Sequence, residues 1–273
     1  MAVIDTSADI HPTAVIGAGA RIGGRTTIGA YSVIGPQVVL GEGNIVGPHV
    51  VIEGHTLVGD GNHIFQFASV GAAPQDLKYS GEDTLLQIGS GNIIREYVTL
   101  QPGTAGGHKR TVIGDKNMFM ACSHVGHDGV IGSNNVFANS CALAGHVTVG
   151  SNVIVGGLCG IHQFVRVGDF TMLGAGCMVT KDIPPFCIAQ GDRAGLVGIN
   201  QIGLERNGFP VEEVQLLRRL YREIFYGSRT LVQRMAAAKE AHAGSRAAEQ
   251  FLTFISESER GVTFPRRRGE AGD

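Results

Sequence analysis

The sequence is poor in the residues that build aromatic-rich cores, membrane spans and basic surfaces. It has no tryptophan, and only 6% of its 273 residues are aromatic and 17% charged. No apolar run approaches the roughly 18 residues that a membrane-spanning helix needs, so we expect no integral membrane segment. The net charge of −2 lacks the basic excess of nucleic-acid-binding proteins, so no nucleic-acid partner is expected. The first ten residues carry acids instead of the basic start of a secretory signal, which predicts a cytoplasmic protein.

Glycine is abundant instead, with 41 copies, and it usually follows an aliphatic residue that recurs at every sixth position. The first such series runs through Ile10, Ile16, Ile22, Ile28, Ile34, Leu40, Val46, Ile52, Val58, Ile64 and Val70. An α-helix has a period of 3.6 and a strand a period of 2, so a strict period of six fits neither alone. It is the hexapeptide signature of a parallel β-helix, whose short strands each turn one aliphatic side chain inward.

The period of six is interrupted twice, at 72–87 and at 101–112, and then continues to Val179. Asp76 and Glu82 stand where aliphatic residues are due, so the first segment must loop out of the coil. Loops of this length in a compact array are usually functional or disordered. The second segment is rich in glycine and charge, and we expect it to form an exposed, mobile loop.

The repeat is expected to end at Pro184-Pro185, because proline donates no ladder hydrogen bond. Residues 1–185 are therefore predicted to form the β-helix, and 186–273 a connector and a C-terminal helical domain. Three helices are expected within it, at 211–226, 229–242 and 246–259. The predicted fold class is an all-β solenoid of hexapeptide repeats with a C-terminal α-helical cap, ending in a solvated tail that contains Arg266, Arg267 and Arg268.

Three of the five cysteines follow the repeat. Cys141, Cys159 and Cys177 are 18 residues apart, and each lies four residues after an inward aliphatic residue. If one turn takes three hexapeptides, residues 18 apart stack on successive coils at a spacing of roughly 4.8 Å. We interpret these cysteines as a ladder of buried thiols that fills the core, and not as a metal or disulfide set.

The same spacing brings together polar residues that depart from the repeat. Gly145 is 18 residues after His127, so it should lie directly above it, with His146 one residue further along that edge. His124 precedes His127 by three residues, and His162 falls on the next coil. Four of the ten histidines are thus expected on two or three adjacent coils.

Three interpretations of this cluster remain open. A metal site of three imidazoles suits a β-helix hydratase such as a γ-type carbonic anhydrase. An acid–base site with one working histidine, oriented by Asp128, suits acyl transfer from a thioester to a sugar hydroxyl or amine. A non-catalytic scaffold with hydrogen-bonded surface histidines is the third. The N–H of Gly145 beside His127 favours acyl transfer, because an oxyanion needs a donor within reach and glycine lets the backbone come close.

Several motifs carry a more specific resemblance. They are His124-Val125-Gly126-His127-Asp128, Leu143-Ala144-Gly145-His146, Ile161-His162-Gln163-Phe164, Gln75-Asp76-Leu77-Lys78-Tyr79 and Ile188-Ala189-Gln190-Gly191. They closely resemble the UDP-N-acetylglucosamine O-acyltransferase family of lipid A biosynthesis. The resemblance implies a left-handed β-helix and a homotrimer with active sites between neighbouring subunits. It also implies (R)-3-hydroxyacyl-acyl carrier protein as donor, and as acceptor the glucosamine 3-position of UDP-N-acetylglucosamine or its 3-amino analogue.

The resemblance further implies a role for each matching residue, with no metal and no cofactor. His127 would be the general base toward the attacking 3-hydroxyl, Asp128 would support it, and the Gly145 amide would hold the oxyanion. The implied substrate contacts are Asp76, Lys78, His124, His146, His162, Gln163, Asn200 and Arg206. The acyl-chain pocket would be closed by Ala175 and Arg193. Ile202 and Asn207 depart from the family pattern, which often has an acid and a second basic residue at these places.

Overall fold

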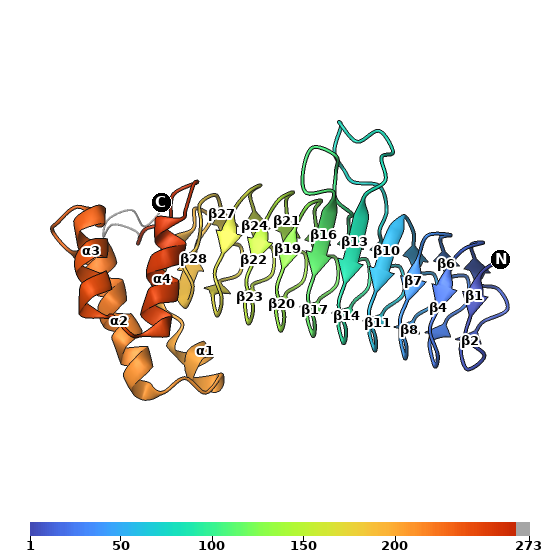
Figure 1. The fold of residues 1–273 in the computed structure, drawn as a ribbon, viewed down its shortest axis with the longest axis horizontal. Coiled ribbons are helices and arrows are strands. Elements are labelled where there is room, and N and C mark those ends of the chain that lie inside the picture. The colour runs from blue at the N-terminus through green and yellow to red at the C-terminus, as the bar shows by residue number, and fades with distance from the viewer. Residues whose placement is uncertain (266–273) are drawn as a thin grey trace.

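The chain winds into a left-handed parallel β-helix of about 10 turns, closed at its C-terminal end by α-helices (Figure 1). This computed structural model describes residues 1–265. The arginine run 266–268, expected from the sequence to be a solvated tail, lies outside the described residues. The hexapeptide solenoid and its C-terminal helical cap, both predicted from the sequence, are confirmed.

The strands form three sheets, one for each edge of the coil. Sheet A contains β1 (Val3–Ile4), β4 (Arg21–Ile22), β7 (Val39–Leu40), β10 (His55–Val58), β13 (Leu85–Ile88), β16 (Arg110–Ile113), β19 (Val130–Ile131), β22 (Thr148–Val149) and β25 (Arg166–Val167). Sheet B contains β2 (Asp9–Ile10), β5 (Thr27–Ile28), β8 (Ile45–Val46), β11 (His63–Ile64), β14 (Ile93–Ile94), β17 (Met118–Phe119), β20 (Val136–Phe137), β23 (Ile154–Val155), β26 (Met172–Leu173), β28 (Cys187–Gln190) and β29 (Gly195–Ile199). Sheet C contains β3 (Val15–Ile16), β6 (Val33–Ile34), β9 (Val51–Ile52), β12 (Ser69–Val70), β15 (Thr99–Leu100), β18 (His124–Val125), β21 (Ala142–Leu143), β24 (Gly160–Ile161) and β27 (Met178–Val179).

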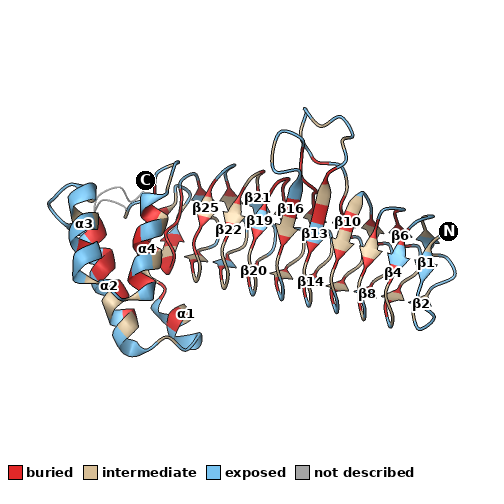
Figure 2. Ribbon diagram, in the orientation of Figure 1, coloured by how far each residue is buried: buried red, intermediate tan, exposed pale blue. Residues whose placement is uncertain are grey.

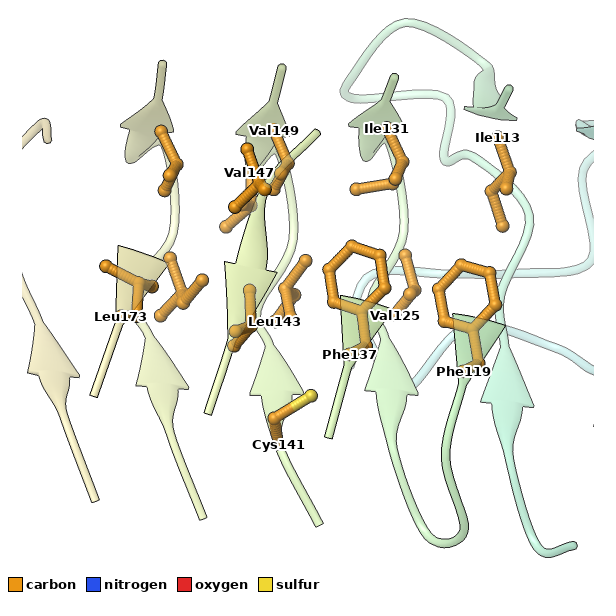
Figure 3. Packing of buried hydrophobic residues seen from close by; sticks show 14 of the residues in the cluster. Ile113, Phe119, Val125, Ile131, Phe137, Cys141, Leu143, Val147, Val149 and Leu173 are labelled. Carbon is orange, nitrogen blue, oxygen red and sulfur yellow. The ribbon is translucent and has the colours of Figure 1, made fainter. Parts of the chain in front are cut away.

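The core is the inside of the coil. From β4 onward the second residue of each two-residue strand is buried, because successive strand side chains point to opposite faces (Figure 2). Residues 18 apart pair on neighbouring coils, as Val125 does with Leu143. Figure 3 shows these side chains stacked in rows, with the rings of Phe119 and Phe137 parallel and 4.7 Å apart. Each coil therefore depends on its neighbours to bury its apolar side chains.

The predicted ladder of thiols is part of this core. Cys141, Cys159 and Cys177 are at most 2% exposed, and none of the three forms a disulfide. Burial raises the pKa of Cys141 to about 12, with the neighbouring Cys159 acting in the same direction. These side chains fill space as small apolar groups.

A buried ladder of asparagines, which the sequence analysis did not anticipate, runs along the corner between sheets A and B. The backbone N–H and the side-chain Nδ2 of Asn62 donate to Asn44 Oδ1 at 2.9 and 3.0 Å. Asn92 makes the same pair of bonds to Asn62, and Asn117 makes it to Asn92. The N–H of Asn135 then donates to Asn117 Oδ1. The ladder crosses the coils that carry both interruptions. It therefore keeps these coils in register with their neighbours.

Two loops leave the coil at the corner between sheets C and A, and both project on the same side of the solenoid (Figure 1). Loop 1 (71–84) connects β12 to β13, and loop 2 (101–109) connects β15 to β16. Both loops are shorter than predicted, because β13 and β16 begin within the segments assigned to them. The expectation of an exposed second loop is wrong for its first part, since residues 101–104 are buried.

The C-terminal region contains the three expected helices and one more. The helices are α1 (Gln201–Arg206), α2 (Val211–Tyr226), α3 (Leu231–Ala241) and α4 (Arg246–Ser256). The short α1 was not expected, and β28 and β29 continue sheet B after the two prolines. The apolar face of α2 buries Leu217, Leu220 and Ile224. Within residues 1–265, no helix is long and apolar enough to cross a membrane.

Candidate active site

A groove crosses the outer face of sheet C, over β18, β21, β24 and β27. Its floor is made by the outward residues of these strands, His124, Ala142, Gly160 and Met178, which stack in register. Its volume of about 520 Å³ lies within the range of roughly 300–1,000 Å³ that is usual for ligand sites. Five predicted site residues line it: His124, His127, Gly145, His162 and Gln163.

His127 and Asp128 form a hydrogen-bonded pair at the corner after β18. Nδ1 of His127 donates to Oδ2 of Asp128 at 2.9 Å, and the two residues are 8% and 1% exposed. With the proton on Nδ1, the opposite nitrogen, Nε2, is an acceptor. Burial acts to raise the pKa of Asp128, but hydrogen bonds from Thr104 and His127 outweigh it and hold that pKa below its ordinary value. The carboxylate is therefore a fixed anion behind the imidazole.

Gly145 lies on the next coil directly against His127, as the spacing of 18 predicted. A Cβ atom on Gly145 would lie 2.5 Å from Nε2 and from Cε1 of His127, so only glycine fits there. Within residues 1–265 the N–H of Gly145 donates no hydrogen bond. Gly145, whose backbone N–H has no partner among these residues, thus lies beside the acceptor nitrogen of His127 at the edge of the groove.

His124 and His146 flank this pair on two sides. Nδ1 of His124 lies 2.6 Å from the hydroxyl of Thr99, and burial lowers its pKa, with His127 adding to the effect. His146 lies behind the pair, with Nε2 4.0 Å from Oδ2 of Asp128 and its ring stacked on Phe164. Burial also lowers the pKa of His146, against the opposing charge of Asp128. His146 does not line the groove.

The far side of the groove carries His162 and Gln163 on the coil after Gly145. Nδ1 of His162 lies 3.2 Å from Nη2 of Arg260, and Nε of Arg260 donates to the carbonyl of Thr180. Arg260 comes from the segment after α4, so no local pattern in the sequence pointed to it. It brings a cation to this end of the groove.

Asp76 and Lys78 lie in loop 1, next to Gln75, which lines the groove. Oδ1 of Asp76 accepts a hydrogen bond from the Lys78 N–H, and the Lys78 side chain is exposed. The charge of Asp76 acts on the pKa of His146, which places this carboxylate near the histidine cluster. Neither side chain lines the groove itself.

Four other predicted residues lie outside the groove of a single chain. Asn200 is buried and caps α1, with Oδ1 accepting the Gly203 N–H and Nδ2 donating to the Phe170 carbonyl. The remaining three are exposed: Arg206 ends α1, Ala175 lies at the corner after β26, and Arg193 lies in the turn before β29. Their predicted substrate contacts remain predictions.

Sequence reasoning missed several residues of the site. Gln101, Met178 and Thr180 line the groove, and Thr104 donates to Asp128. Met178 could have been found, since it is the outward residue 18 positions after Gly160. Thr104 and Gln101 belong to an insertion without periodicity, so no spacing argument reaches them.

The ligand atoms of His127, Asp128 and His146 lie within 4.8 Å of one another, which is close enough to share a metal ion. However, Oδ2 of Asp128 already accepts hydrogen bonds from His127 Nδ1 and from the hydroxyl of Thr104. A cation bound to this oxygen would compete with both donors. The arrangement therefore favours acid–base chemistry over metal binding.

Family comparisons match both parts of the chain. The bacterial transferase hexapeptide family matches residues 19–54, and the second domain of UDP-N-acetylglucosamine O-acyltransferase matches residues 182–263.

Relatives that match most of the chain agree with these families. An acyl-[acyl-carrier-protein]–UDP-N-acetylglucosamine O-acyltransferase of Myxococcus xanthus is 50% identical over 210 residues, covering 77% of this chain and 81% of the relative. The enzyme of the same name from Trichlorobacter lovleyi is 51% identical over 206 residues, covering 74% of this chain and 79% of the relative. The structure of UDP-N-acetylglucosamine acyltransferase from Campylobacter jejuni is 36% identical and superposes with a TM-score of 0.90, covering 94% of this chain and 100% of that one.

Proposed function

Because the chain belongs to the acyl-[acyl-carrier-protein]–UDP-N-acetylglucosamine O-acyltransferase family, we propose that it transfers an acyl chain from acyl carrier protein to UDP-N-acetylglucosamine in lipid A biosynthesis. The donor is an (R)-3-hydroxyacyl thioester, and the acceptor is the hydroxyl at the glucosamine 3-position or the amine of the 3-amino analogue. The observation that carries the proposal is the His127–Asp128 pair beside the free N–H of Gly145, at the edge of the groove.

The first step is general-base catalysis by His127. Its Nε2 accepts the proton of the 3-hydroxyl as the oxygen attacks the thioester carbonyl and forms the new C–O bond. The positive imidazolium is then stabilised by the buried carboxylate of Asp128, 2.9 Å from Nδ1. The C–S bond breaks as the tetrahedral intermediate collapses, and the imidazolium returns its proton to the leaving thiolate. The sequence of steps regenerates neutral His127.

The oxyanion of the intermediate is held by the backbone N–H of Gly145. This amide has no hydrogen-bond partner within residues 1–265, and Gly145 lies against the imidazole that activates the nucleophile. A preorganised donor of this kind is usually worth several kilocalories per mole, because it needs no reorganisation when the charge develops.

The active site is completed by a second copy of the chain in a homotrimer. Support comes from the open outer face of the groove, and from Asn200, Arg206, Ala175 and Arg193, which lie outside the groove of one chain. Reduced thiols on neighbouring coils support a reducing compartment, the cytoplasm.

The test is an assay of the purified protein with a panel of acyl-carrier-protein thioesters and both sugar acceptors, with products identified by mass spectrometry. We expect one acylated UDP-sugar and free acyl carrier protein. If neither product forms from any donor, the proposal is rejected. An ester product assigns the 3-hydroxyl as acceptor, and an amide product assigns the 3-amine.

A further inference from the structure

The carboxylate of Asp128 is held from behind by loop 2. The hydroxyl of Thr104 donates to Oδ2 of Asp128 at 2.6 Å, and the backbone N–H of Thr104 lies 3.0 and 3.2 Å from Oδ2 and Oδ1. Thr104 is 3% exposed. Two donors from one buried residue therefore engage the group that orients His127.

Asp128 needs such support because its surroundings do not fix it by themselves. Its carboxylate lies between two imidazoles, with Nδ1 of His127 at 2.9 Å and Nε2 of His146 at 4.0 Å. Without further donors, rotation of the carboxylate toward His146 would release His127.

Loop 2 is packed around this carboxylate closely enough to exclude larger residues. A Cβ atom on Gly107 would lie 2.3 Å from Cγ of Asp128. The loop is tied in turn to loop 1, since the N–H of Ala105 donates to Oε1 of Glu82 at 3.1 Å. Hydrogen bonds from the backbone N–H groups of Ser80 and Ala105 lower the pKa of Glu82 to about 2. The Glu82 carboxylate that joins the two loops is therefore ionised at neutral pH. These contacts of loop 2 hold Thr104 in place against Asp128.

We propose that Thr104 is a positioning residue for acyl transfer, whose hydroxyl and amide hold the Asp128 carboxylate facing His127 Nδ1. This inference rests on the proposed function, because it assigns to Thr104 a role that acts through the general base. Thr104 holds the Asp128 carboxylate, which accepts the Nδ1 proton of His127. The lone pair of His127 therefore stays on Nε2, toward the groove. Thr104 does not line the groove.

The test compares Thr104→Val with Thr104→Ser. Valine has nearly the shape of threonine without its hydroxyl, while serine keeps the hydroxyl. We expect Thr104→Val to lower kcat on the order of 10- to 100-fold, because a charge-assisted hydrogen bond is lost. The KM for either substrate should change less than about twofold, since the residue acts in the transition state. Thr104→Ser should keep kcat within about threefold of the parent.

Thr111→Val is the matched control. Thr111 lies in the neighbouring β16, it is fully buried, and its hydroxyl has no partner within residues 1–265. Its replacement should leave kcat unchanged, which separates loss of a particular hydrogen bond from loss of any buried hydroxyl. If Thr104→Val does not fold by circular dichroism, Thr104→Ala takes its place with the same expectation.

A double-mutant cycle tests whether the effect passes through Asp128. In an Asp128→Asn background, Thr104→Val should reduce kcat by less than about twofold further, because its target is already altered. Full additivity would overturn the inference, as would a kcat of Thr104→Val within twofold of the parent. Failure of the proposed function is distinguishable, because the parent protein itself would then form no acylated UDP-sugar. Loss of rate in His127→Ala but not in Thr104→Val rejects the positioning role alone.

Discussion

Gly145 and His127 lie on adjacent coils in such close contact that a methyl group on Gly145 would come within 2.5 Å of the imidazole. The spacing of the coils, and not a flexible loop, therefore places the base next to the backbone donor. The strands that precede the two residues, β18 and β21, are paired in register.

Gly145→Ala should lower kcat/KM on the order of 100-fold, since His127 must move and a shift of about 1 Å in a catalytic group has that effect. Gly106→Ala is the control, because a Cβ atom there meets nothing within 4 Å. Steady-state rates and thermal melts of both variants check this. Parent-like activity of Gly145→Ala would mean that the observed position of His127 is not the working one.

His127→Ala should lose on the order of 10²- to 10⁴-fold in kcat, the usual contribution of a positioned proton acceptor. The variant should stay folded, because His127 lies at a corner outside the aliphatic core. His11→Ala, an exposed histidine of the first coils, should be unaffected. A variant at His127 that kept most of the parental rate would require another base.

The thiol ladder predicts both slow labelling and a loss of stability at high pH. Cys122 is exposed and should react with iodoacetamide at once, whereas Cys141, Cys159 and Cys177 should react only after unfolding. Rapid labelling of the three in the native protein, located by mass spectrometry, would contradict their burial.

The alkaline effect follows from Cys141, whose pKa is raised by burial from 9.0 to about 12. Its contribution to stability is present in full below pH 9, where the thiol is neutral in both states. It is lost as the pH rises from 9 toward 12, because the unfolded chain ionises first. Urea titrations between pH 8 and 11 should show this decline, and Cys141→Ala should show a shallower one. An equal decline in both proteins would assign the effect to other groups.

Ala175→Met should shift the preferred donor to a shorter acyl chain, and Ala175→Gly should shift it to a longer one. Overpacking costs about 1–3 kcal/mol, and the longest chain meets the added atoms first. The measurement is a competition among acyl-carrier-protein donors of increasing length. An unchanged preference in both variants would mean that the acyl pocket ends elsewhere, and Met178, at the end of the groove, is the next position to test.

Removal of metal should leave the rate unchanged, since Oδ2 of Asp128 is engaged by His127 and Thr104. The check is activity after dialysis against a chelator, with metal content measured by mass spectrometry. Loss of activity that returns on adding a divalent cation would favour the alternative of a hydratase-like metal centre at His127, Asp128 and His146.

The repeat made much of the molecule predictable. Its period of six located the strands, and the spacing of 18 placed Gly145 against His127 and buried Cys141. The role of loop 2 was not predictable, because an insertion has no period from which the contact of Thr104 with Asp128 could be inferred. Arg260 was out of reach for a similar reason, since its neighbour His162 is 98 residues away in the sequence.

The asparagine ladder bears on how such enzymes diversify. Hydrogen bonds join Asn62 to Asn92 and Asn92 to Asn117, although 30 and 25 residues separate them, so the coils stay aligned whatever length of chain is inserted between them. The ladder lies at a different corner from the one where both loops leave. Loops of different length can therefore leave the corner between sheets C and A while the coils on either side keep their register.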